Sequence, residues 1–150
     1  MPLGADARSR LYLPLADDEA FWIGAIGTDP PLAAELAVRV EVQRRGSVDA
    51  LSGKRWNARV PRRIAISTFS TIDGIRRAGG GLWVFARRSA VRPAPACKSL
   101  HFTAQAVEKP HRRAVASIEL VDYPTFRERT DTVPPAPLDP DAGYKGWRLP

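Results

Sequence analysis

The side chains that could carry chemistry in this chain are few and widely spaced. Its 150 residues include two histidines, His101 and His111, and one cysteine, Cys97. Nucleophilic catalysis needs a nucleophile, a base and an orienting acid close together. His101, four residues after Cys97, is the one base near that thiol in sequence. We predict that Cys97 is a small residue in a proline- and alanine-rich loop and that both histidines are solvated, so no catalytic residue is predicted.

Metal and phosphate motifs are incomplete as well. The acidic run 17–19 predicts a solvated turn, and Asp139 and Asp141 have calcium-like spacing without the glycine and distal glutamate of a calcium loop. Three glycines at 79–81 follow two arginines, but no Lys-Ser/Thr pair completes a phosphate loop, so a hairpin turn is predicted there. One cysteine excludes an intrachain disulfide and a cysteine-based zinc site. We predict no metal and no cofactor.

Positive charge is concentrated in the middle of the chain. The net charge is +7, but residues 44–113 hold sixteen basic residues against three acids, whereas residues 1–43 hold seven acids against three bases. Nineteen of the 23 basic residues are arginines, whose guanidinium groups bind phosphate and carboxylate bidentately. A coding preference for arginine together with ordinary solubility is the plainer explanation. The acidic ends could also pair with the basic middle, in the same or a neighbouring chain.

Several arginine doublets recur near expected strand ends, with Trp56, Phe69 and Trp83 between them. Arginines beside aromatic residues are typical of grooves that bind single-stranded nucleic acid. The same doublets would also lie on the solvated rim of any β domain, with the aromatic residues in its core. The predicted site for an anion or a partner consists of Arg62, Arg63, Arg76, Arg77, Arg87, Arg88, Arg112 and Arg113.

Alternating apolar residues predict the elements that would position these arginines. In residues 36–43, Leu36, Val38, Val40 and Val42 alternate with polar residues, which is the pattern of a half-buried strand. The runs 100–107 and 114–121 alternate in the same way and predict a hairpin. Residues 20–27 and 82–86 are apolar on both faces, which predicts strands that are buried on both sides.

These runs predict an all-β fold, an antiparallel sandwich or barrel-like fold of about seven to eight short strands. We expect one domain over residues 1–130 and a proline-rich C-terminal tail over 131–150. In that tail Tyr144, Trp147 and Leu149 are expected to dock, either on the domain or on a neighbouring subunit.

One stretch of the chain consists of Ile72-Asp73-Gly74-Ile75, a glycine turn and the apolar run from Leu82 to Ala86. It resembles a Leu-Asp-Gly-Ile segment, a turn and an apolar strand in a group of small bacterial and fungal β-rich proteins with no assigned activity. The segment 48–53 is similar to another of its segments. This chain lacks the group's tryptophan before Leu-Asp-Gly-Ile and its Arg-Gln pair. The resemblance implies β structure and nothing about function.

The function predicted first is a non-enzymatic binding or assembly module with an arginine-rich surface. We expect a homo-oligomer or a larger protein assembly, or an anionic partner, either nucleic acid or acidic glycan. The alternatives are a lectin-like carbohydrate- or anion-binding module with Trp56 or Trp147 as a stacking platform, a nucleic-acid-binding protein, and an enzyme with His101 in a pocket beside a carboxylate.

No apolar run reaches the ~20 residues that a membrane-spanning helix needs, and no apolar segment of a signal peptide follows Met1–Arg10. We therefore expect a cytoplasmic protein without a membrane partner, and export by a route that needs no signal peptide stays open.

Overall fold

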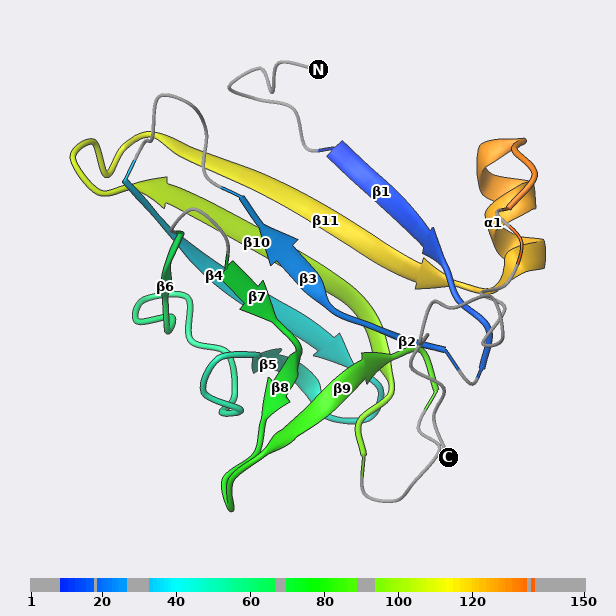
Figure 1. The fold of residues 1–150 in the computed structure, drawn as a ribbon, viewed down its shortest axis with the longest axis horizontal. Helices are drawn as coiled ribbons and strands as arrows, with labels where there is room; N and C mark the ends of the chain where they lie inside the picture. The colour runs from blue at the N-terminus through cyan, green and yellow to red at the C-terminus, as the bar shows by residue number, and fades with distance from the viewer. Residues whose placement is uncertain are drawn as a thin grey trace.

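The computed structural model describes residues 9–17, 19–26, 33–66, 70–88, 94–134 and 136, and in these residues the protein is all-β with one short helix (Figure 1). The prediction of an all-β fold is therefore confirmed. The strands are β1 (Ser9–Pro14), β2 (Ala20–Phe21), β3 (Ile23–Ala25), β4 (Ala34–Val42), β5 (Gly46–Asp49), β6 (Ile64–Ile66), β7 (Ser70–Ile72), β8 (Gly74–Arg76), β9 (Leu82–Ala86), β10 (Cys97–Ala106) and β11 (Arg113–Val121).

The largest sheet has the strand order β1-β11-β10-β4-β5, and β6 also pairs with β4. β10 and β11 form the hairpin that alternation predicted, and β10 pairs with the whole length of β4 on its other side. Both β5 and β6 therefore share the second edge of β4, with β6 at Ala34–Leu36 and β5 at Arg39–Val42. β1 adds a parallel edge strand beside β11.

Two smaller sheets cover one face of the large sheet, and the described strands do not close into a barrel (Figure 1). The smaller sheets have the orders β2-β9-β8 and β3-β7. Trp22 separates β2 from β3, and Asp73 separates β7 from β8. Residues 20–25 thus pair first with β9 and then with β7, so the smaller sheets meet at a fork.

The core lies between the large sheet and the smaller ones. β4 contributes Leu36, Val38, Val40 and Val42, none more than 5% exposed, as their spacing predicted. Ile72, Ile75 and Phe85 belong to the same buried cluster from the opposite layer. Each fully buried side chain of this size stabilises the fold by about 1.5–3 kcal/mol.

The prediction that residues 20–27 and 82–86 are buried on both sides was wrong. Trp22 is 51% exposed, Ile26 is 73% exposed and Leu82 is 44% exposed. Phe21, Ile23 and Trp83 pack against the core, so these strands have an inner and an outer face. Their composition misled the prediction because an apolar residue on the surface looks the same in sequence as one in the core.

Helix α1 (Tyr123–Thr130) follows β11 directly. The Asp122 side chain accepts a hydrogen bond from the Thr125 backbone N–H at 2.8 Å, and Asp131 ends the helix with a left-handed φ of 51°. No helix in the described part of the chain is long and apolar enough to cross a bilayer. The predicted docking residues Tyr144, Trp147 and Leu149 lie outside the described residues.

Candidate anion-binding site

The loop after β5 is organised by one buried carboxylate. Asp49 is only 4% exposed, and its Oδ1 accepts hydrogen bonds from the backbone N–H groups of Leu51 (2.9 Å) and Ser52 (3.0 Å). Its Oδ2 accepts a third from the Arg62 backbone N–H at 2.8 Å. A buried carboxylate needs such donors, because it has lost its hydration. Asp49 therefore ties both ends of the segment 51–62 to the end of β5.

The same loop packs directly against β8. The Arg76 backbone N–H donates to the carbonyl oxygen of Ala50 at 2.9 Å. Gly53 has a φ of +70°, and a Cβ at this position would overlap the carbonyl oxygen of Arg76. Glycine suits both the left-handed backbone and the close approach. Arg76 is thereby placed beside the loop that carries Arg62 and Arg63.

These segments surround a hollow of about 380 Å³. Its lining includes Arg62, Arg63 and Arg76, all exposed, together with Ser52. Within the described part of the chain, no aspartate or glutamate lines it and no carboxylate forms an ion pair with any of the three arginines. Three like charges around one hollow repel one another, and an anion placed among them would relieve that repulsion.

A second hollow, of about 410 Å³, shares Arg76 with the first. It is also lined by Arg45, Arg55, Arg77 and Trp83. The Arg77 guanidinium carbon lies 4.3 Å from the centre of the Trp83 ring, which is a cation–π contact. Trp83 is half-buried against the core and so fixes Arg77 at the rim. Four of the eight arginines predicted from sequence, at positions 62, 63, 76 and 77, are thus brought together; Arg45 and Arg55 were not in the predicted set.

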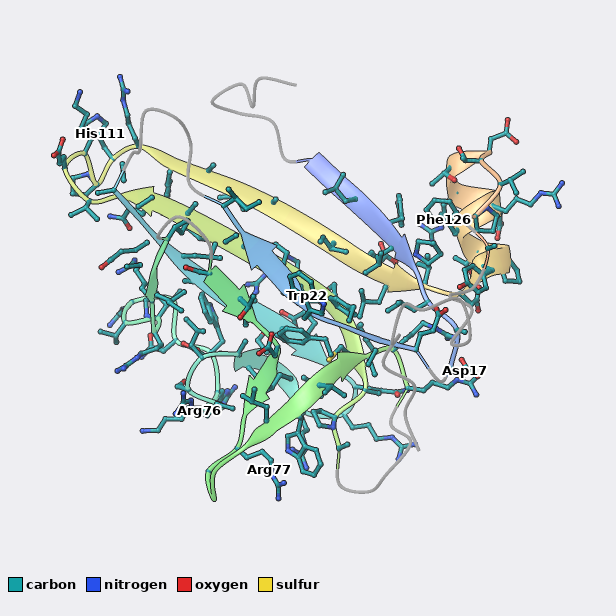
Figure 2. The ribbon with its side chains drawn as sticks, in the orientation of Figure 1. Asp17, Trp22, Arg76, Arg77, His111 and Phe126 are labelled. Atoms are coloured by element: carbon teal, nitrogen blue, oxygen red, sulfur yellow. The ribbon has the colours of Figure 1, made fainter. Side chains whose placement is uncertain are left out.

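Figure 2 shows Arg76 and Arg77 far from both Asp17 and the hairpin that carries His111. Arg87 and Arg88 both pair with Asp17, and the Arg88 contact is 2.8 Å. Arg87 Nε also donates to the Leu15 carbonyl oxygen at 3.2 Å. This pair therefore ties the acidic N-terminal region to the basic middle within one chain.

Arg112 and Arg113 are exposed at the β10–β11 hairpin, apart from both hollows. The eight arginines predicted as one site therefore do not form one. Arginine doublets recur near several strand ends, and sequence alone does not say which strand ends lie side by side.

His101 lies on the polar face of the large sheet and is half-buried, not fully solvated as predicted. Its Nδ1 is 2.9 Å from the Ser117 hydroxyl and its Nε2 is 3.1 Å from the Ser99 hydroxyl. Burial lowers the pKa of His101, Arg39 lowers it further, and Glu41 opposes the shift. Each ring nitrogen thus contacts a serine hydroxyl, and among the described residues no carboxylate is hydrogen-bonded to the ring, as the orienting acid of a triad would be.

Cys97 is the first residue of β10 and is 1% exposed in the core, so the prediction of a loop position was wrong. A register shift between Cys97 and Ser99 turns Cys97 toward the core, whereas His101 faces away from it. Burial raises the pKa of the Cys97 thiol to about 11. The thiol and the imidazole therefore lie on opposite faces of the sheet and cannot act as a pair.

The other residues considered from sequence have structural roles or lie outside the described part. Glu19 accepts hydrogen bonds from the Ala16 backbone N–H and the Tyr123 hydroxyl. Trp56 is half-buried, and its backbone N–H donates to the Ser47 carbonyl oxygen. Among the described residues no three His, Cys, Asp or Glu side chains form a metal-binding group; Asp139, Asp141, Phe69 and Trp147 are not among those residues.

No family model matches this chain, and no curated protein or solved structure is similar to it.

Proposed function

We propose that this protein is a non-enzymatic binding module that holds a phosphate- or sulfate-bearing polymer at the paired arginine hollows. The observation that carries this proposal is the convergence of Arg62, Arg63 and Arg76 on one hollow that no carboxylate of the described residues lines. Arginine binds such oxyanions through paired N–H donors, which makes these contacts stronger than neutral hydrogen bonds.

A polymer fits the site better than a single small anion. The two hollows share Arg76, and the second adds Arg45, Arg55 and Arg77. A ligand with several anionic groups along a chain would engage both hollows at once. Neutralising several of its charges would release counterions and make binding strongly salt-dependent.

The lining argues for binding without chemistry. Among the residues that the structure describes, neither hollow is lined by a histidine, cysteine, aspartate or glutamate. The Ser52 hydroxyl lines the first hollow, but a serine nucleophile needs an adjacent base. The site therefore offers charge and hydrogen-bond donors and no group that would accept a proton.

Two triple variants of equal charge change test the proposal. R62A/R63A/R76A removes the lining arginines, whereas K109A/R112A/R113A removes three positive charges from the exposed β10–β11 hairpin. Binding of single-stranded DNA and of heparin would be measured at salt concentrations of about 50–200 mM. For single-stranded DNA we expect R62A/R63A/R76A to weaken binding and to reduce the salt slope by roughly two, at ~0.7 per lost phosphate contact.

We expect the hairpin variant to stay close to wild type with both polymers. Equal weakening by the two variants would show that net charge alone attracts the polymer and would contradict the proposal. The comparison of DNA with heparin decides between nucleic acid and acidic glycan. Self-association and docking of the tail remain predictions, which light scattering on the full chain and on a chain ending at Thr130 would test.

A further inference from the structure

A third hollow, of about 670 Å³, opens on the outer face of the smaller sheets. Its apolar lining includes Phe21, Trp22, Leu82 and Val84, and its polar lining includes Thr71 and Asp73. It shares no described residue with the two arginine hollows. Figure 2 shows Trp22 where the strands of the smaller sheets meet.

The fork in strand pairing explains why a hollow forms there. Phe21 pairs with Phe85 on β9, whereas Ile23 pairs with Ile72 on β7. β8 then takes up the pairing with β9 beyond Asp73. Trp22 and Asp73 are the residues at which these ladders separate, so their side chains lie on the outer face beside the opening.

The lower part of this hollow is anchored in the core. The Phe21 and Phe85 rings stack with centroids 5.4 Å apart, and Phe85 is fully buried. A Cβ at Gly74 would overlap the Trp83 carbonyl oxygen, so β8 and β9 are in close contact next to Asp73. The lining is therefore held by packed strands and not by a loop.

The chemistry of the lining points to a positively charged ligand. Asp73 is exposed, and no cationic side chain in the described ranges forms an ion pair with it. Trp22, which is 51% exposed, adds an indole, the best aromatic partner for a cation. A sugar would need several hydrogen-bonding groups, and the described lining residues offer few polar side-chain groups, namely the Asp73 carboxylate, the Thr71 hydroxyl and the Trp22 indole N–H.

We propose that this hollow binds an organic cation, an amine carried on an apolar or aromatic body. The ammonium group would lie at the Asp73 carboxylate and the Trp22 indole, and the apolar body would cover Leu82 and Val84. Such a site combines a mostly apolar lining with a single orienting charge, as small-molecule pockets do. It is independent of the proposed polyanion site, because it takes a ligand of the opposite charge at other residues.

To test this, the full chain would be titrated with phenethylamine and, separately, with 3-phenylpropionate. Binding would be monitored by amide NMR and by calorimetry. The two probes share an aromatic body and carry opposite charges. We expect phenethylamine to shift the amide signals of Trp22, Asp73 and Val84, and 3-phenylpropionate not to. Asp73→Asn should weaken phenethylamine binding about tenfold or more, because a charge-assisted contact is lost.

Two further variants make the result decisive. Trp22→Leu keeps an apolar side chain and removes the indole, so it should also weaken phenethylamine binding. Glu128→Gln, which removes an exposed carboxylate on α1, should leave binding unchanged. Each variant should keep the wild-type amide spectrum away from the hollow, which shows that it is folded. Equal binding of both probes, unchanged affinity in Asp73→Asn, absence of phenethylamine binding, or binding of methyl glucoside in its place would overturn the proposal.

Discussion

The buried carboxylate of Asp49 accepts a hydrogen bond at 2.8 Å from the backbone N–H of Arg62, thirteen residues further along the chain. This bond closes the loop that also packs through Gly53 against Arg76. The arginine hollow therefore depends on an acid that does not line it. Its cationic side chains are exposed, but the backbone that carries Arg62 is hydrogen-bonded to the buried Asp49 carboxylate.

Replacing Asp49 by alanine should destabilise the fold. Three backbone N–H groups would lose their acceptor, and a buried polar group left without a partner costs about 1–3 kcal/mol. Urea denaturation would measure the loss, and amide exchange should accelerate at Leu51, Ser52 and Arg62. Asp131→Asn, an exposed control, should change the stability by no more than about 0.5 kcal/mol. Wild-type stability in Asp49→Ala would refute this account of the loop.

Gly46 and Gly53 have nearly the same positive φ, so a comparison of their alanine variants separates the cost of backbone strain from the cost of a steric clash. Gly46 has a φ of +71°, and a Cβ at this position would meet no neighbouring atom, whereas at Gly53, with a φ of +70°, it would overlap the Arg76 carbonyl oxygen. Gly46→Ala should cost about 1–2 kcal/mol for the left-handed conformation alone. Gly53→Ala should cost more, and it should also weaken heparin binding by displacing Arg76. Similar losses of stability in the two variants would mean that the close contact between Gly53 and the Arg76 carbonyl oxygen does not contribute to stability.

Stability should depend on pH through His101. Its folded pKa lies below the ordinary value of 6.5, because burial and Arg39 disfavour the charged ring. The unfolded chain therefore takes up the proton at a higher pH than the folded chain does. The contribution of His101 is complete above 6.5 and is lost as the pH falls through that value toward the folded pKa.

Urea midpoints measured from about pH 8 to about pH 5 would test this. His101→Gln should flatten the decline relative to wild type, and His111→Gln, at the exposed hairpin, should leave it unchanged. A decline that is as steep in His101→Gln as in wild type would assign it to other groups.

Cys97 should be inert in the folded protein. Burial raises its pKa to about 11, and a hydrogen bond with the Ala86 backbone opposes that shift only in part. The thiolate is the reactive form, and at a pH near 8 about one thiol in a thousand would be ionised at that pKa. An aromatic disulfide reagent should therefore react slowly with the native chain. In guanidinium, where the chain is unfolded, it should react rapidly with one thiol per chain. Fast labelling of the native protein would contradict the buried position.

Part of this protein could be predicted from its sequence, because strand alternation is a local property of the backbone. Leu36, Val38, Val40 and Val42 face the core at the spacing their sequence shows, and the hairpin of β10 and β11 forms where two alternating runs follow each other. The four-residue spacing of Cys97 and His101 did not reveal the register shift that places them on opposite faces of β10.

The grouping of the arginines was decided by tertiary structure alone. Arg87 reaches an aspartate seventy residues earlier, and Arg62 meets Arg76 only because Asp49 and Gly53 close a loop onto β8. The exposure of Trp22 depends on a fork between three strand pairs, which apolar composition does not encode. The alternation of apolar and polar residues predicts on which face of its own strand each side chain lies. Which strand lies next to it, and whether anything covers that side, depends on pairings between distant parts of the chain.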